Sequence, residues 1–171
     1  MLNLSKYNRF DAMIVRNEGC LRKVCRLYGG DNSALRDDLY QEIACNLWES
    51  WHSFRGECST TTWVRRVALN VAISQHRQLA RQPQFEPLTN EILETVADGS
   101  IRSEDPPPNY YAIIDRHDPD ERALLYLRLD RCSIKEIAQT LLISEAAVKQ
   151  RFYRIRIKLD NLNKKSNNNE Y

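Results

Sequence analysis

The sequence has only five glycines in 171 residues and few runs of alternating β-branched residues. Its apolar residues instead recur at intervals of three and four, the helical period, which excludes a sheet-rich fold and predicts an almost entirely helical protein. No segment reaches the roughly 18 apolar residues of a membrane span, and the amino terminus has no apolar signal core. We therefore expect a cytoplasmic protein without stable membrane insertion.

Motifs of metal binding and catalysis are also missing. None of the five cysteines forms a CxxC pair, and the three histidines are far from them and from each other, whereas a zinc site needs clustered ligands. A GxSxG elbow, a glycine-rich phosphate loop and an HExxH pattern do not occur. We expect no metal, no cofactor and no enzymatic activity, with the cysteines as reduced, mostly apolar helix residues.

The net charge of +2 is distributed unevenly along the chain. Residues 1–82 carry a net +4, residues 83–121 a net −8 and residues 122–171 a net +6. Two basic segments around an acidic one predict two polyanion-binding modules joined by a connector that nucleic acid would repel. Five of the six prolines fall within 83–117. The predicted architecture is two helical domains, 1–82 and 118–171, joined by a flexible acidic linker, 83–117.

The first module begins with a helical pattern over residues 7–28. A break or bend is expected near Gly19, and a stop is expected at Gly29 and Gly30. The next helix, capped by a residue of the Asp31-Asn32-Ser33 segment, contains DLYQE. This places three polar side chains on one face, namely Asp38, Gln41 and Glu42. A carboxylate-based active site would need further converging acids or a histidine, which the spacing does not supply.

A glycine loop, RGEC, separates this acidic helix from a basic one. Ser59 or Thr60 supplies the N-cap of a helix that begins near Thr61. One face of that helix is an apolar stripe of Val64, Val67, Ala68 and Val71. Another face is rich in hydrogen-bond donors and contains Arg66, Asn70, Ser74, Arg77 and Arg81. The pattern predicts one buried side and one side available to a polyanion.

The second module has the pattern of a helix-turn-helix. DPDE at 118–121 starts one helix, SIKE at 133–136 is a capping box for a short second helix, and Ser144 caps a longer third helix after the turn LLIS. The apolar stripe of the third helix is Val148, Phe152, Ile155, Leu159 and Leu162. Polar and small residues surround the stripe: Ala146, Ala147, Lys149, Gln150, Tyr153 and Arg154. This face suits the DNA major groove, where Gln and Arg read bases and Lys binds phosphates.

Both halves resemble the extracytoplasmic-function (ECF) sigma factors, small bacterial sigma factors that keep only domains two and four. DLYQE followed by NLWESWHSFRGECSTTTWVRRVALNVAISQHR resembles their pattern of DLxQExFxxxW, FRG and a TW helix with RNxAxxxxR. SIKEIAQTLLISEAAVKQRFYRIRIKL resembles their carboxyl-terminal helix-turn-helix. The resemblance implies an all-α fold with a domain-two helical bundle and a domain-four helix-turn-helix.

The resemblance also implies a role for each matching position. By the resemblance, the residues that dock on RNA polymerase are Asp38, Leu39, Gln41 and Glu42. Recognition and melting of the minus-ten element, with capture of a flipped base in the loop, fall to Phe54, Arg55, Gly56, Glu57, Cys58, Ser59, Thr60, Trp63, Arg66, Asn70 and Arg77. Contact with the minus-thirty-five element falls to Ser144, Ala146, Ala147, Lys149, Gln150, Tyr153 and Arg154. Trp48, Trp51, Val71, Phe152 and Ile155 also match family positions, but their physical interpretation is core.

The implied partners are core RNA polymerase, through its clamp coiled coil and flap, double-stranded promoter DNA and the melted non-template strand. An anti-sigma factor linked to the membrane is also implied. The linker is expected to thread toward the polymerase active-site channel and RNA exit path. Two alternatives stay open at this point: a helix-turn-helix regulator that acts without polymerase, and an anti-sigma decoy that keeps the fold but does not bind DNA.

Overall fold

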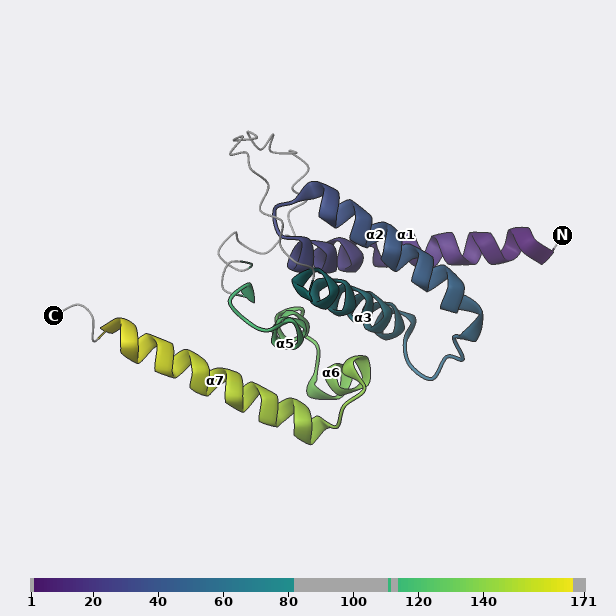
Figure 1. Ribbon diagram of the computed structural model, residues 1–171. Helices are drawn as coiled ribbons and strands as arrows, with labels where there is room; N and C mark the ends of the chain where they lie inside the picture. The colour runs from purple at the N-terminus through teal and green to yellow at the C-terminus, as the bar shows by residue number, and fades with distance from the viewer. Residues whose placement is uncertain (1, 82–110, 112–113, 168–171) are drawn as a thin grey trace, which may run out of the picture.

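The computed structural model describes residues 2–81, 111 and 114–167, and every regular element among them is helical (Figure 1). The first module comprises α1 (Leu2–Gly29), α2 (Ser33–Ser50), the 3-10 helix η1 (Trp51–Ser53) and α3 (Thr60–Arg81). The second comprises α5 (Pro119–Leu129), α6 (Ile134–Leu141) and α7 (Glu145–Asn167). The predicted all-α fold class is confirmed. Most of the predicted linker, 83–110, lies outside the described residues.

The turn between α1 and α2 requires glycine. Gly30 has a φ of +56°, in the left-handed region that glycine adopts without steric cost. A Cβ on Gly29 would lie 2.8 Å from the Cγ atom of Arg36. The side chain of Asn32 then accepts a hydrogen bond from the backbone N–H of Leu35 at 3.1 Å and caps α2. The predicted stop is confirmed, and Asn32 is the cap among the three candidates.

Helix α1 continues through Gly19, so of the two predicted possibilities, a break or a bend, the break is wrong. A glycine inside a helix costs about 1 kcal/mol relative to alanine. Leu21 and Val24, on the following turn, are fully buried. Burial of such side chains contributes about 1.5 to 3 kcal/mol each, which outweighs the glycine penalty. Packing of the amphipathic face therefore keeps the helix continuous.

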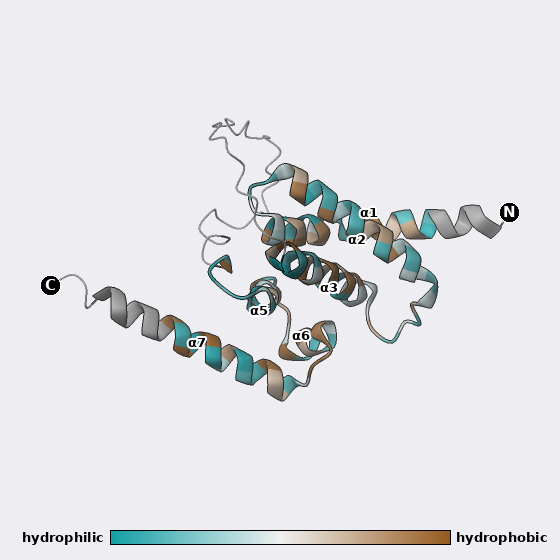
Figure 2. Cartoon of the chain, viewed as in Figure 1, coloured by the Kyte–Doolittle hydropathy of each residue, from teal (hydrophilic) through white to brown (hydrophobic). Residues whose placement is uncertain are grey.

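Helices α1, α2 and α3 pack against one another as a three-helix bundle. Figure 2 shows hydrophobic and hydrophilic bands along α3, as the sequence pattern predicts for an amphipathic helix. Leu39 and Ile43 of α2 and Ala68 and Leu69 of α3 are fully buried. Among the described helices, none combines the length and apolar character needed to cross a bilayer.

The helix-turn-helix is fixed by its caps. Ser133 accepts a hydrogen bond from the Glu136 backbone N–H at 3.2 Å, and the Glu136 carboxylate accepts one from the Ser133 N–H at 2.8 Å, so the predicted capping box is confirmed. Leu142 ends α6 with a φ of +55°, a left-handed conformation that is uncommon for leucine. The Ser144 hydroxyl then caps α7 through the Ala147 N–H at 3.1 Å.

The stripe on α7 is buried only over part of its length. Val148 and Ile155 are buried and Phe152 is half-buried, whereas Leu159 is exposed. The carboxyl-terminal part of α7 extends past α5 and α6 in Figure 1. The side chain of Leu162 lies outside the described residues.

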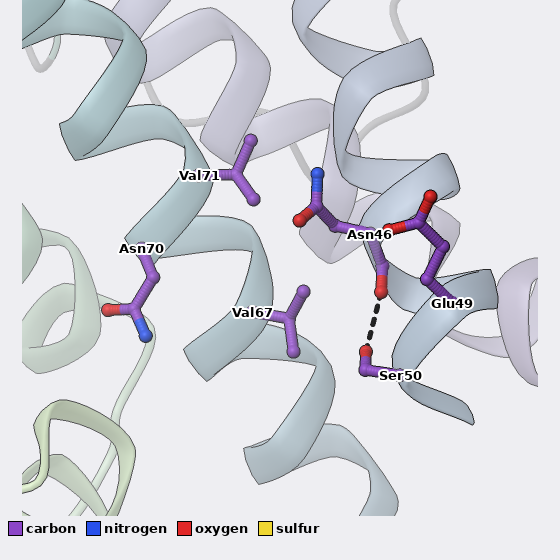
Figure 3. A pocket seen from close by; sticks show the side chains of 6 residues that line it. All are labelled: Asn46, Glu49, Ser50, Val67, Asn70 and Val71. Carbon is purple, nitrogen blue, oxygen red and sulfur yellow. Dashed lines mark hydrogen bonds between the residues drawn. The ribbon is translucent and has the colours of Figure 1, made fainter. Parts of the chain in front are cut away.

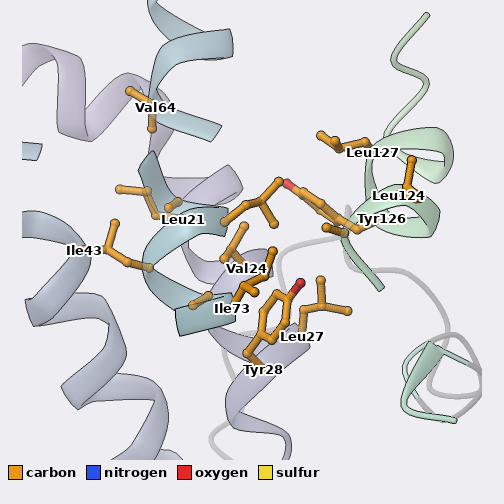
Figure 4. Close-up of a cluster of buried hydrophobic side chains, with 14 of the residues drawn as sticks. Leu21, Val24, Leu27, Tyr28, Ile43, Val64, Ile73, Leu124, Tyr126 and Leu127 are labelled. Atoms are coloured by element: carbon orange, nitrogen blue, oxygen red, sulfur yellow. The ribbon is translucent and has the colours of Figure 1, made fainter. Parts of the chain in front are cut away.

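The two modules are packed against each other. Helices α5 and α6 both contact α3, and α5 buries Leu124, Tyr126 and Leu127. Figure 4 shows Tyr126 extending from α5 toward the helices of the first module. Its hydroxyl donates to the Sγ atom of Cys20 on α1 at 3.5 Å. Ile114, in the stretch predicted as linker, is also buried.

Candidate nucleic-acid and protein interface

The acidic face predicted on α2 is present at the surface. Asp38, Gln41 and Glu42 are all exposed. The Glu42 carboxylate accepts a hydrogen bond from the side-chain amide of Gln75 on α3 at 3.0 Å, which orients it. Leu39, predicted to share this face, has 0% exposed surface. Leu39 therefore supports the face by packing beneath it, and a partner could reach only the three polar side chains.

The loop between α2 and α3 lies over an aromatic cluster. Phe54 stacks on Trp51 with ring centroids 6.1 Å apart, and Trp63 of α3 lies 5.1 Å from Phe54. Trp63 is only 8% exposed. The sequence prediction placed it near DNA, but the structure places it in the scaffold that fixes the loop. Trp48 and Trp51, predicted as core, are half-buried members of this cluster through edge contacts with Phe10.

The tip of the loop is accessible. Arg55, Gly56 and Glu57 are exposed, and Gly56 has a φ of +75°, which explains a glycine at this position. Cys58 is half-buried. The Ser59 hydroxyl accepts a hydrogen bond from the Thr62 N–H at 3.1 Å, so Ser59 caps α3, which begins at Thr60.

A pocket of about 410 Å³ opens between α2 and α3, close to this loop (Figure 3). Its lining residues are Asn46, Glu49 and Ser50 of α2 and Val67, Asn70 and Val71 of α3. Sequence reasoning identified Asn70 but missed the α2 residues. The signal was available, because Asn46 and Ser50 are four residues apart and therefore share a helical face.

The pocket has both a polar and an apolar wall. Ser50 donates to the Asn46 backbone oxygen at 2.5 Å, and the Asn46 amide donates to the Glu42 backbone oxygen at 2.9 Å. The Asn46 side-chain oxygen and the Asn70 amide make no hydrogen bond within the described part of the chain. Val67 and Val71 supply apolar surface beside them. In Figure 3 the Asn70 side chain points away from Asn46, so Asn46 is the amide that lies beside the methyl-lined wall. An amide next to apolar surface suits a flat heterocycle with donors and acceptors on its edge.

Several α3 arginines are paired with residues of the second module. An Nη atom of Arg66 donates to the Gln139 backbone oxygen on α6 at 2.7 Å, and Arg77 pairs with Asp120 at 2.5 Å. Arg65, which sequence reasoning missed, pairs with Asp130 and donates to the Sγ atom of Cys132 at 3.2 Å. Burial lowers the pKa of Arg65, but the nearby thiols and Asp130 raise it above its ordinary value, so it stays charged.

The face predicted on α7 is open. Lys149, Gln150, Tyr153 and Arg154 are all exposed, and Tyr153 retains 64% of its surface. Ala146 is exposed and Ala147 is half-buried beside the Ser144 cap, so these two positions near the amino-terminal end of α7 carry only small side chains. The helix is held by Lys158, which pairs with Glu121 of α5 at 2.5 Å. Within the described residues, no three Asp, Glu, His or Cys side chains gather as metal ligands would.

Comparison with known families identifies both modules. A model of sigma-70 region 2 matches residues 13–82, and a model of sigma-70 region 4 matches residues 111–159. Together, and in this order, they cover more than half of the chain. The chain belongs to the sigma-70 family. Within it, the chain is an ECF-type sigma factor, as its relatives show.

The sigma factor is 32% identical over 121 residues to the ECF RNA polymerase sigma factor SigX of Bacillus subtilis, a match that covers 66% of this chain and 62% of SigX. It is 28% identical over 136 residues to the ECF RNA polymerase sigma-E factor of Haemophilus influenzae, covering 72% of each chain. The match thus spans less than two thirds of the length of SigX.

Solved structures show the same fold. CnrH, in its complex with the cytosolic domain of CnrY, superimposes with a TM-score of 0.62 at 20% identity, covering 91% of this sigma factor and 88% of CnrH. The sigma factor RpoE of Bartonella quintana, in its co-crystal with the anti-sigma factor NepR, gives 0.64 at 19% identity, covering 91% and 97%. The expected pair of sigma domains is therefore confirmed as a fold.

Proposed function

We propose that this sigma factor binds core RNA polymerase and directs it to promoters by reading the minus-ten and minus-thirty-five elements. One observation carries the proposal. Regions 2 and 4 occur in the order of the family, and each presents an exposed polar face at the positions predicted from the sequence. Polymerase supplies the chemistry of RNA synthesis, and this chain supplies promoter recognition and helps to open the duplex.

Docking on polymerase is assigned to the exposed acidic face of α2. Asp38, Gln41 and Glu42 offer two carboxylates and an amide on neighbouring turns. A coiled coil that presents arginines and amides, such as the polymerase clamp, would bind such a face through charge-assisted hydrogen bonds. Leu39 beneath them keeps the helix in place. The flap is the proposed partner of region 4.

Minus-ten recognition is assigned to the pocket between α2 and α3 together with the loop from Phe54 to Thr60. Opening a duplex needs a place for an unstacked base, and about 410 Å³ is ample for one base. Asn46 has a polar atom available for the base edge, Val67 and Val71 would contact its face, and Asn70 lies at the border of the pocket. Stacking and apolar contact contribute about 1 to 3 kcal/mol per base.

Minus-thirty-five recognition is assigned to α7. Ala146 and Ala147 in its amino-terminal half have small side chains, so the helix can approach the base pairs of the major groove closely. Gln150, Arg154 and Lys149 are exposed, which supports base reading by Gln150 and Arg154 and phosphate binding by Lys149. Tyr153 adds an exposed ring beside them.

An anti-sigma factor is a further proposed partner, because both structural neighbours were solved with protein partners, CnrY and the anti-sigma factor NepR. Such a partner would occupy the α2 face and release it to polymerase on a signal. The acidic segment 83–117 is proposed to thread through the polymerase channel as the link between the two DNA-reading regions.

Titration of fluorescently labelled chain with core polymerase tests the docking assignment. Asp38→Arg and Glu42→Arg are expected to weaken binding by at least about tenfold. Each variant replaces a carboxylate that would attract cationic groups of polymerase with an arginine that those groups repel. Asp11→Arg makes the same charge change at an exposed position of α1 and serves as the matched control. Equal binding by all four proteins would contradict the assignment.

A further inference from the structure

Three arginines on one helix are bound by groups of the other module. Arg65, Arg66 and Arg77 lie along α3, in the region assigned to minus-ten DNA. Asp130 holds Arg65, the Gln139 carbonyl holds Arg66 at 2.7 Å and Asp120 holds Arg77 at 2.5 Å. Carboxylate and carbonyl oxygens thus stand where the phosphate oxygens of a DNA strand would stand.

The two aspartates bind only groups of the first module. The Asp130 carboxylate pairs with Arg65 and, at 3.3 Å, with Lys23 of α1. The Asp120 carboxylate pairs with Arg77. Neither side chain bonds a residue of α5, α6 or α7 in the described part of the chain. The ion pairs of both side chains are therefore made between the modules, although Asp120 also lies in the first turn of α5, where a carboxylate interacts favourably with the helix dipole.

Further contacts hold the same arrangement. The Tyr28 hydroxyl donates to the Pro119 backbone oxygen at 2.7 Å, and Tyr126 is buried between α5 and the first module. The α7 face is left uncovered, since Lys149, Gln150 and Arg154 are exposed. The arrangement pairs three cations of region 2, with Arg65 largely covered and Arg77 still half exposed, and leaves the α7 face of region 4 free.

We infer that region 4 acts as a built-in competitor of single-stranded DNA on region 2, with Asp120 and Asp130 as phosphate mimics. The inference rests on the proposed function and adds a form of regulation to it. In the free chain the three arginines of α3 are paired and so less available to the melted strand, while α7 remains able to bind duplex DNA. Binding to polymerase would separate the modules and uncover the arginines, so that strand capture occurs only after docking.

The test compares full-length variants in binding a fluorescein-labelled, random-sequence single strand of about 20 nucleotides. Asp120→Asn with Asp130→Asn neutralises both mimics. Asp115→Asn with Asp118→Asn removes the same charge from partners within the second module, Arg122 and Lys158, and is the matched control. Small-angle scattering and circular dichroism report opening and folding of each protein.

The neutralised pair is expected to bind the strand at least about tenfold more tightly than wild type, with a larger radius of gyration. Its log–log salt slope should steepen by about 2, because three freed arginines each contribute about 0.7 on a single strand. The control pair should match wild type. If the neutralised pair stays compact, a second comparison uses two double variants: Asp120→Lys with Asp130→Lys, and its control, Asp115→Lys with Asp118→Lys. Lysines at positions 120 and 130 repel Arg77 and Arg65 and so separate the modules.

A folded, open variant that binds the strand no better than its control overturns the inference. Run-off transcription with core polymerase separates this result from a failure of the proposed function. If wild type initiates at promoters while opening gives no gain in strand binding, the competitor idea fails and the sigma assignment stands. If wild type does not initiate, the sigma assignment itself fails.

Discussion

Replacing Asn70 with alanine is expected to weaken promoter selection without weakening the fold. Asn70 is exposed, lines the pocket between α2 and α3, and makes no side-chain hydrogen bond within the described residues. Its removal should change the free energy of unfolding by no more than about 0.5 kcal/mol, as for other exposed positions. A lost amide contact to a base edge is worth about 1 to 3 kcal/mol, which is about 5- to 150-fold in binding.

The assay is single-round run-off transcription from promoters that carry each of the four bases at the captured minus-ten position. Wild type should favour one base, and Asn70→Ala should reduce that preference by the stated factor. Ser74→Ala, an exposed polar residue one turn further along α3, is the control and should leave the preference unchanged. An unaltered base preference in Asn70→Ala would refute the pocket assignment.

Three further predictions concern region 4. Ser133→Ala removes the capping box and should lower the free energy of unfolding by about 1 kcal/mol, measured by urea denaturation. Lys149→Ala should weaken binding to all duplexes and reduce the salt slope by about 0.9, whereas Gln150→Ala should alter base preference by about 1 to 3 kcal/mol, both measured by fluorescence anisotropy. Burial raises the pKa of Glu121, but hydrogen bonds, led by that from Lys158, lower it below its ordinary value. The Glu121 carboxylate therefore stabilises the fold at pH values above the ordinary glutamate pKa, and this stabilisation is lost as pH falls through the pKa of Glu121 in the folded protein. Glu121→Gln should accordingly flatten the acid side of the curve of unfolding free energy against pH.

Local signals in the sequence predicted the helices well. Capping residues and glycine turns act within a few positions of one another, so Ser133, Ser144 and Gly30 could be predicted directly, and the cap of α2 could be narrowed to three residues that include Asn32. The break expected at Gly19 was wrong because the packing of α1 against α2 and α3 outweighs a single glycine. Periodicity correctly predicted that Val148, Phe152 and Ile155 face inward on α7, but it could not show that Leu159 is exposed.

The site was predicted in part. Exposure of the α2 and α7 faces follows from amphipathic spacing, which is a property of one helix at a time. The pocket residues Asn46 and Ser50 and the buried state of Trp63 depend on how α2 and α3 meet. The pairing of Arg65 with Asp130 joins residues 65 positions apart in different modules. No periodicity in a single sequence specifies such a contact.

The central claim is that this chain confers promoter-dependent initiation on core RNA polymerase. The most direct measurement is sequencing of run-off transcripts made by purified core polymerase from a promoter library, with and without the chain. The account predicts new transcripts with defined start sites, preceded by shared minus-ten and minus-thirty-five elements, that vanish when Asp38→Arg replaces wild type. Transcripts identical with and without the chain would contradict it.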